Sequence, residues 1–245
     1  MRSDRAGPLS GSGDGFTVAL VGADGSGKTT VARLLPGRLG VPCRYVYMGV
    51  SLSSSNRMLP TTRLVRALKS FDGDGADEGG PPDPESRSAP GGPVARAVKA
   101  LRSSFRMAVI VSEEWYRQSI AWWHVRQGRI VVFDRHFFLD YYNYDITRPR
   151  TLGQRCHGWM LEHLLPRPQL VLFLDAPADT LFARKGEGTL ELLERRRQDY
   201  LAAGHVLPHF TTLDATQPME SVLACATARI EQFAADVSGR GRCTS

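Results

Sequence analysis

The segment that begins at Gly22 reads Gly-Ala-Asp-Gly-Ser-Gly-Lys-Thr and fits the phosphate-binding pattern G-x-x-x-x-G-K-[ST]. Its glycines let the backbone curl so that N–H groups point at phosphates, and the helix that starts there adds the positive end of its dipole. Lys28 is expected to reach the β- and γ-phosphates of ATP, and the Thr29 hydroxyl to ligate Mg²⁺. The predicted nucleotide-binding residues are Gly22, Ala23, Asp24, Gly25, Ser26, Gly27, Lys28, Thr29 and Thr30.

A second group of chemically useful residues ends the apolar run Ile-Val-Val-Phe, which is followed by Asp134 and Arg135. Ligands of open α/β sheets bind at the carboxyl ends of the strands, so Asp134 is expected beside the loop as a second magnesium ligand. The alternative is an aspartate that only caps the next turn. Arg135 is then placed to stabilise the transferring phosphoryl group or to grip the acceptor. Asp175, after a further apolar run, is either a ligand or a turn residue.

A third group is cationic and lies on both sides of a glycine-bearing break. Arg184 and Lys185 precede the break, and the run Arg195, Arg196, Arg197 follows it. A hinge between cations is typical of a lid that closes over phosphates and excludes water. Consecutive helical residues point about 100° apart, so at least one of the three arginines is expected on an exposed face.

These residues need an α/β framework to bring them together, and the chain alternates short apolar runs with longer amphipathic stretches. The continuous apolar runs predict strands that are buried on both faces of a parallel sheet. The expected strands are 16–21, 43–48, 129–133, 170–174 and 210–213. The expected helices are 28–39, 93–127, 152–165, 177–185, 190–203 and 220–237, the second of which is long enough to suggest a kink or a break.

Composition sets the class of protein. The 245 residues are 42% hydrophobic and 23% charged, no apolar run approaches the length of a membrane span, and the first residues lack a signal-peptide core. We therefore expect a cytoplasmic protein with no membrane partner. The net charge of +6 fits either an anionic substrate or a solvated arginine-rich surface. Four scattered cysteines suggest free buried thiols and not a disulfide framework or a zinc site.

Two polar segments interrupt the pattern. Residues 1–15 are predicted to be a disordered tail, and residues 70–93, dense in Gly, Pro, Asp and Ser, a flexible insertion. We expect a single domain over 16–237 and a second disordered tail over 238–245.

Taken together, GADGSGKTT, GRIVVFDRH, LVLFLDAP, the basic segment ending in RxxY, and LDATQPMESV resemble the thymidylate kinase family of nucleoside monophosphate kinases. The resemblance covers about 16–233. It implies a P-loop NTPase fold, a three-layer sandwich with a five-stranded parallel sheet in the order 2-3-1-4-5. It also implies Arg135 near the acceptor phosphate, Asp24 near an acceptor hydroxyl, and a homodimer. Family members without an arginine in the loop carry the compensating cations in the lid. Here that role falls to Arg184, as a catalytic residue, and to Lys185 and Arg197.

The chain departs from the family in the acceptor region. Where the family carries an Ala-Asp-Arg stretch, this chain reads Ser-Glu113-Glu114-Trp-Tyr-Arg117, which shifts the arginine by about one helical turn. The segment after the Asp-Arg pair is an aromatic and acidic run that includes Phe137, Phe138, Asp140 and Tyr141. These aromatic side chains either pack in the core or contact a sugar or base. The family's Arg-Glu-Pro segment after the second strand is absent.

Three functions fit the sequence. The first is transfer of the ATP γ-phosphate to a nucleoside monophosphate, dTMP first, which requires cations and no general base. The second is phosphorylation of a hydroxyl on a sugar, nucleoside or secondary metabolite, which requires a carboxylate. The candidate carboxylates are Asp24, Glu113, Glu114, Asp134 and Asp140. The third, a non-enzymatic nucleotide- or nucleic-acid-binding module, is disfavoured because no motif that reads nucleic acid is present.

Overall fold

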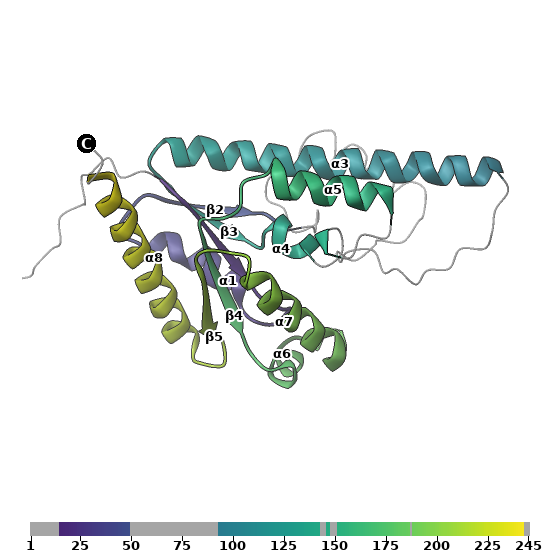
Figure 1. Cartoon of the computed structure of the whole chain (residues 1–245). Coiled ribbons are helices and arrows are strands. Elements are labelled where there is room, and N and C mark those ends of the chain that lie inside the picture. The colour runs from purple at the N-terminus through teal and green to yellow at the C-terminus, as the bar shows by residue number, and fades with distance from the viewer. Residues whose placement is uncertain (1–14, 50–92, 143–145, 148–150, 187, 243–245) are drawn as a thin grey trace, which may run out of the picture. The chain divides into compact units, whose positions relative to one another are not determined.

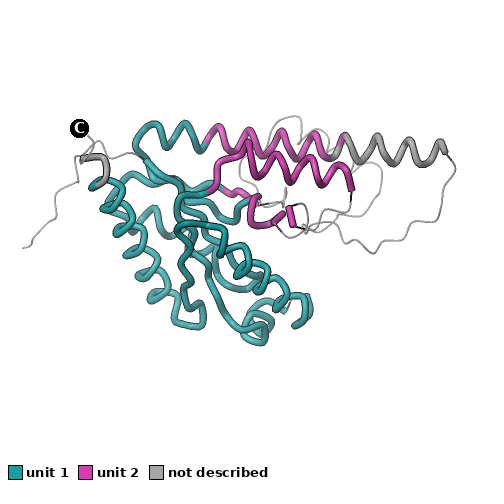
Figure 2. Tube along the Cα trace, viewed as in Figure 1, with its two compact units in different colours: residues 1–46, 121–136, 168–245 teal, residues 47–120, 137–167 magenta. Residues whose placement is uncertain are grey.

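The computed structural model of the chain describes residues 15–49, 93–142, 146–147, 151–186 and 188–242 (Figure 1). The predicted insertion at 70–93 lies outside the described residues apart from Pro93, and the predicted tail at 1–15 lies outside them apart from Gly15. The described residues divide into two compact units (Figure 2). Unit 1 comprises residues 1–46, 121–136 and 168–245, and unit 2 comprises residues 47–120 and 137–167.

A five-stranded parallel sheet in the order β2-β3-β1-β4-β5 is centred on unit 1. The strands are β1 (Thr17–Val21), β2 (Cys43–Tyr47), β3 (Ile130–Asp134), β4 (Leu170–Asp175) and β5 (Phe210–Asp214). β1 is fully buried and pairs in register with β3 and β4, with Leu20 opposite Asp134 and Val21 opposite Phe173. The α/β class, the parallel sheet and its strand order are confirmed.

The helices of unit 1 are α1 (Lys28–Leu34), the 3₁₀ helix η1 (Leu35–Gly37), α6 (Ala178–Lys185), α7 (Leu190–Gly204) and α8 (Met219–Arg242). One face of the sheet forms the main core, where Leu20 and Leu172 pack with Val31 of α1 and Ile230 of α8. On the other face, Tyr200 of α7 packs its ring against Phe173 of β4, and Phe173 stacks on Phe210 of β5. Helices therefore flank the sheet, as the alternating apolar pattern predicts.

Unit 2 is helical. It contains most of α3 (Pro93–Arg126), together with α4 (Phe137–Tyr141) and α5 (Leu152–His163). The N-terminus of α5 has a capping box, in which Thr151 Oγ1 accepts from Gln154 N at 3.2 Å and Gln154 Oε1 accepts from Thr151 N at 3.0 Å. The run after Arg135 forms α4, and its aromatic side chains are buried, so their predicted packing role is confirmed.

Several predicted boundaries are wrong. The first helix ends at Leu34 and passes into η1, because Pro36 lacks the N–H that a continuing α-helix needs. The long helix α3 is continuous. The last helix α8 runs to Arg242, into the stretch expected to be a tail. Cys156 and Cys225 are exposed thiols and not buried ones. Among the described residues, no helix is both long and apolar enough to cross a membrane.

Candidate functional site

The loop between β1 and α1 depends on glycine. A Cβ at Gly22 would lie 2.7 Å from Leu174 O, and at Gly25, where φ is +90°, a Cβ would lie 2.7 Å from Leu181 O. Any side chain at either position therefore collides with backbone. Ser26 N donates to Ala23 O at 3.2 Å and closes the turn that ends at the first residues of α1. This helix begins without a side-chain cap and without an acidic residue in its first turn, so no side chain of the helix itself satisfies its first N–H groups.

Three cations converge on one carboxylate in this loop. Asp24 Oδ1 lies 2.7 Å from Arg135 Nη2 and 3.5 Å from Lys28 Nζ, and Asp24 Oδ2 accepts from Arg196 Nη1. Lys28 is 4% exposed, and its Nζ also donates to Ala23 O at 3.1 Å. Lysine and arginines from three separate segments therefore share a single negative group at the place where the sequence predicts phosphate.

The charge of Asp24 is fixed by these neighbours. Burial alone raises the pKa of this carboxyl, but Lys28, Arg135 and Arg196 lower it by more, so that the net pKa lies well below the usual range for aspartate. Asp24 is thus an anion at all physiological pH values. An ionised carboxylate that holds three cations is a reasonable stand-in for a phosphate group, because both offer several acceptor oxygens to the same donors.

Asp134 ends β3 and is 0% exposed. Tyr45 in the adjacent strand β2 donates its hydroxyl to Asp134 Oδ2 at 3.0 Å, whereas Oδ1 has no hydrogen-bond partner among the residues that the structure describes. Asp134 pairs with Leu20 of β1, so it lies at the carboxyl ends of the strands, where the loop begins at Gly22. The predicted adjacency of this carboxylate to the loop strand is thereby met, and the residue belongs to the strand and not to a turn.

Arg135 follows in a constrained conformation. Its φ of 68° is the one positive value at a non-glycine position in the described parts of the chain, and its N–H donates to Leu20 O at 3.0 Å. Such a conformation costs on the order of 1 kcal/mol and is found most often at functional sites. The neighbouring His136 is buried, and burial lowers its pKa to about 3. His136 is therefore neutral and adds no charge to the cluster.

The residues present fit Mg²⁺. Two buried oxygens of this region, Asp134 Oδ1 and Ser26 Oγ, have no hydrogen-bond partner among the described residues. Over the described ranges no group of three or more His, Cys, Asp or Glu side chains could hold a metal without a substrate. Magnesium in nucleotide sites takes most of its ligands from phosphates and water and needs only one or two protein oxygens. Thr29, in the first turn of α1, and Asp134 are suitable donors.

The predicted lid residues Arg184, Lys185 and Arg197 lie at three different places in the fold. Arg184 Nη1 donates to Ala215 O at 2.8 Å, at the end of β5, and Lys185 is exposed at the end of α6. Arg197 binds both oxygens of Asp175, at 2.5 Å and 2.9 Å, and this bidentate pair ties α7 to the end of β4. In the described structure the ion pairs of the loop carboxylate Asp24 are formed with Lys28, Arg135 and Arg196 and not with these three residues.

Arg196 is the cation of α7 that reaches the loop, in place of the predicted Arg184, Lys185 and Arg197. The expectation that one of the three consecutive arginines is exposed is confirmed, since Arg195 faces solvent while Arg196 and Arg197 are half-buried. The rotation of α7 about its own axis decides which arginine points towards the loop. The spacing of residues in the sequence does not give that rotation. Tyr45 was also missed, because its role depends on the pairing of β2 with β3.

Unit 2 holds a separate buried polar group around α3. Arg117 is 1% exposed, with Nη1 donating to Gly49 O at 2.8 Å and Nε lying 3.5 Å from Glu113 Oε2. Burial lowers the pKa of Arg117. Glu114 pairs with His157 at 3.1 Å, and both side chains are at most 1% exposed. Glu113 and Glu114, which differ from the family pattern, therefore pair with Arg117 and His157 respectively.

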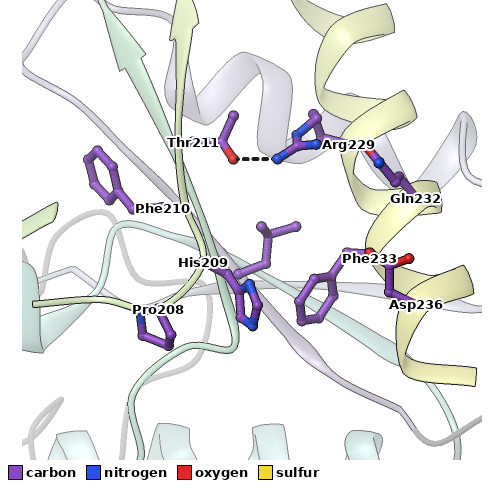
Figure 3. Close-up of a pocket in the computed structure, with 9 residues that line it drawn as sticks. Pro208, His209, Phe210, Thr211, Arg229, Gln232, Phe233 and Asp236 are labelled. Carbon is purple, nitrogen blue, oxygen red and sulfur yellow. Dashed lines mark hydrogen bonds between the residues drawn. The ribbon is translucent and has the colours of Figure 1, made fainter. Parts of the chain in front are cut away.

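A small pocket of about 170 Å³ lies between the start of β5 and α8 (Figure 3). Arg229 donates to Thr211 Oγ1 at 3.0 Å and to Gln232 Oε1 at 2.6 Å across its rim, and the rings of His209 and Phe233 meet edge to face. Because it adjoins the amino-terminal ends of β4 and β5, it is at the opposite end of the strands from the loop. Nucleotide sites of parallel sheets form at the carboxyl ends, so this pocket is not part of the candidate site.

No protein-family model matches the chain, and no curated protein is significantly similar to it in sequence.

Proposed function

We propose that the protein is an ATP-dependent phosphotransferase of the P-loop class that resembles thymidylate kinase, with a nucleoside monophosphate, dTMP first, as its acceptor. The observation that carries the proposal is the convergence of Lys28, Arg135 and Arg196 on Asp24, within a loop whose glycines exclude side chains. Three cations around one anionic position are what a transferring phosphoryl group requires.

In this proposal the loop amides and Lys28 bind the β- and γ-phosphates, while Arg135 and Arg196 move from Asp24 to the phosphoryl oxygens. An oxygen of the acceptor phosphate attacks the γ-phosphorus, and the bond from that phosphorus to the β–γ bridging oxygen breaks, which releases ADP. The acceptor phosphate carries no proton that must be removed, so positioning and charge stabilisation suffice. Thr29 and Asp134 would hold Mg²⁺, which would supply positive charge to the phosphate chain.

The carboxylates support a phosphate acceptor over a hydroxyl acceptor. A general base works best with a pKa near the working pH, yet the pKa of Asp24 lies far below it. Glu113 is matched to Arg117 and Glu114 to His157. Asp134 is buried with one oxygen unpartnered in the described region, and the proposed magnesium role takes it. Asp140, in α4, is only half-buried.

A second candidate function is phosphorylation of a hydroxyl on a sugar, nucleoside or secondary metabolite. One observation favours it: the buried Arg117 in the acceptor region is already offset by Glu113 and bonded to Gly49 O, which reduces its value for holding a second phosphate. Under this alternative Asp134 both orients the hydroxyl and faces the metal.

A coupled ADP-release assay separates the two. The panel contains nucleoside monophosphates on one side and nucleosides and sugars on the other, each with Mg²⁺ and ATP. We expect turnover with dTMP or another monophosphate at ordinary kinase rates, about 1 to 100 per second. Turnover with nucleosides or sugars and silence with every monophosphate removes the first proposal. The Lys28→Ala variant, purified identically, controls for contaminating kinases.

A further inference from the structure

Tyr45, from the neighbouring strand β2, is the side chain that donates a hydrogen bond to Asp134 within the described residues. Its hydroxyl lies 3.0 Å from Asp134 Oδ2. A carboxylate has two oxygens, and a donor fixed on one of them sets the rotation of the group and hence the direction of the other. The fixed oxygen here is Oδ2, and the other, Oδ1, is buried and unpartnered in the described structure.

Tyr45 is itself held in place. It is half-buried in β2, and the Arg33 guanidinium of α1 lies 5.9 Å from the centroid of its ring. A phenol ordinarily titrates at about pH 10, so the hydroxyl is a donor throughout the pH range of an assay.

We infer that Tyr45 is a positioning residue for the nucleotide-bound magnesium: its hydroxyl fixes Asp134 Oδ2 so that Oδ1 faces the metal and its water ligands. The inference rests on the proposed function, since it concerns the same site. Partners behind a metal-binding carboxylate typically contribute a factor of about 10 to 100 in metal affinity. Because Mg²⁺ is bound mainly by phosphate and water, we expect the lower end of that range here.

The test is ATP binding by isothermal titration calorimetry, with saturating Mg²⁺ and separately with EDTA. For Tyr45→Phe we expect binding about tenfold weaker in Mg²⁺ and unchanged in EDTA. A purely structural role of the hydroxyl would weaken binding equally in both conditions. The matched control is Tyr116→Phe, which removes a hydroxyl from a tyrosine of α3 that is half-buried, as Tyr45 is. It should bind like the wild type in both conditions.

A double-mutant cycle adds a second measurement. Asp134→Asn should lose most of the magnesium-dependent gain in affinity, and adding Tyr45→Phe to it should weaken binding no further, because the hydroxyl acts only through the carboxylate. Additive losses overturn the inference, as does a Tyr45→Phe protein that binds Mg²⁺-ATP like the wild type. If the wild type binds no ATP in either condition, the proposed function fails and the inference fails with it. If it binds Mg²⁺-ATP normally and only the Tyr45 effect is missing, the inference alone fails.

Discussion

Replacing Asp24 with asparagine tests whether this carboxylate holds the loop cations in the absence of nucleotide. The change keeps the shape of the side chain and removes its charge, which leaves Lys28, Arg135 and Arg196 close together with no common anion. Charge-assisted hydrogen bonds contribute about 1.5 to 3 kcal/mol when buried. The two arginine side chains are 26% and 28% exposed, so solvent screening reduces each bond to about 1 kcal/mol.

With a smaller contribution from Lys28, we expect Asp24→Asn to lower the free energy of unfolding by about 2 to 3 kcal/mol at pH 7. For a chain of this size that corresponds to a fall of roughly 5 to 10 °C in melting temperature. The assay is urea and thermal unfolding followed by circular dichroism. Asp236→Asn, the same exchange at an exposed position of α8, is the control and should leave the melting temperature unchanged.

The pH dependence gives an independent check with a definite sign. The pKa of Asp24 is depressed in the folded state, so its stabilising contribution is present above the pKa of the unfolded chain and is lost as the pH falls through the folded value. The difference between wild type and Asp24→Asn should thus persist down to about pH 4 and shrink below it. Millimolar pyrophosphate should stabilise the variant more than the wild type, because it replaces the missing anion. Equal stability of the two proteins at pH 7 would refute the reasoning.

The remaining predictions concern three other positions. Lys28→Ala should reduce turnover at least a hundredfold in the ADP-release assay, since it removes the phosphate-binding ammonium, while circular dichroism stays that of the wild type. Gly25→Ala should lower the free energy of unfolding by at least about 2 kcal/mol, because φ is +90° and Leu181 O lies 2.7 Å from the new Cβ. Urea unfolding measures this loss, and an unchanged free energy of unfolding would contradict the loop geometry. Glu114→Ala should cost about 2 to 3 kcal/mol in the same experiment, because it removes the carboxylate that lies 3.1 Å from the buried His157.

The sheet was predictable because its strands are apolar runs that end at polar or turn residues. β1, β3 and β4 are buried on both faces, and burial of this kind leaves a continuous Val, Ile, Leu and Phe signature that fixes each strand to within one or two residues. The helix α4 was missed, since five residues are too few to display a helical period. The early end of α1 could have been read from Pro36, which marks a stop for any α-helix.

Some residues of the candidate site follow from local sequence patterns, and others depend on long-range packing. Lys28 and the loop glycines are set by a contiguous motif, and Asp134 follows from its place at the end of a strand, so both were available from the sequence. Arg196 and Tyr45 depend on the rotation of α7 and on the pairing of β2 beside β3. Those features arise from tertiary packing, which local patterns do not encode.

The backbone at Arg135 has a practical consequence for engineering. Its positive φ means that glycine or asparagine would be less strained there, by on the order of 1 kcal/mol. The ion pair of Arg135 with Asp24 contributes about the same amount, so either substitution should leave the melting temperature nearly unchanged while it removes the guanidinium. A screen that ranks variants by melting temperature would therefore not register the loss of this side chain, and libraries built for thermostability should hold position 135 fixed.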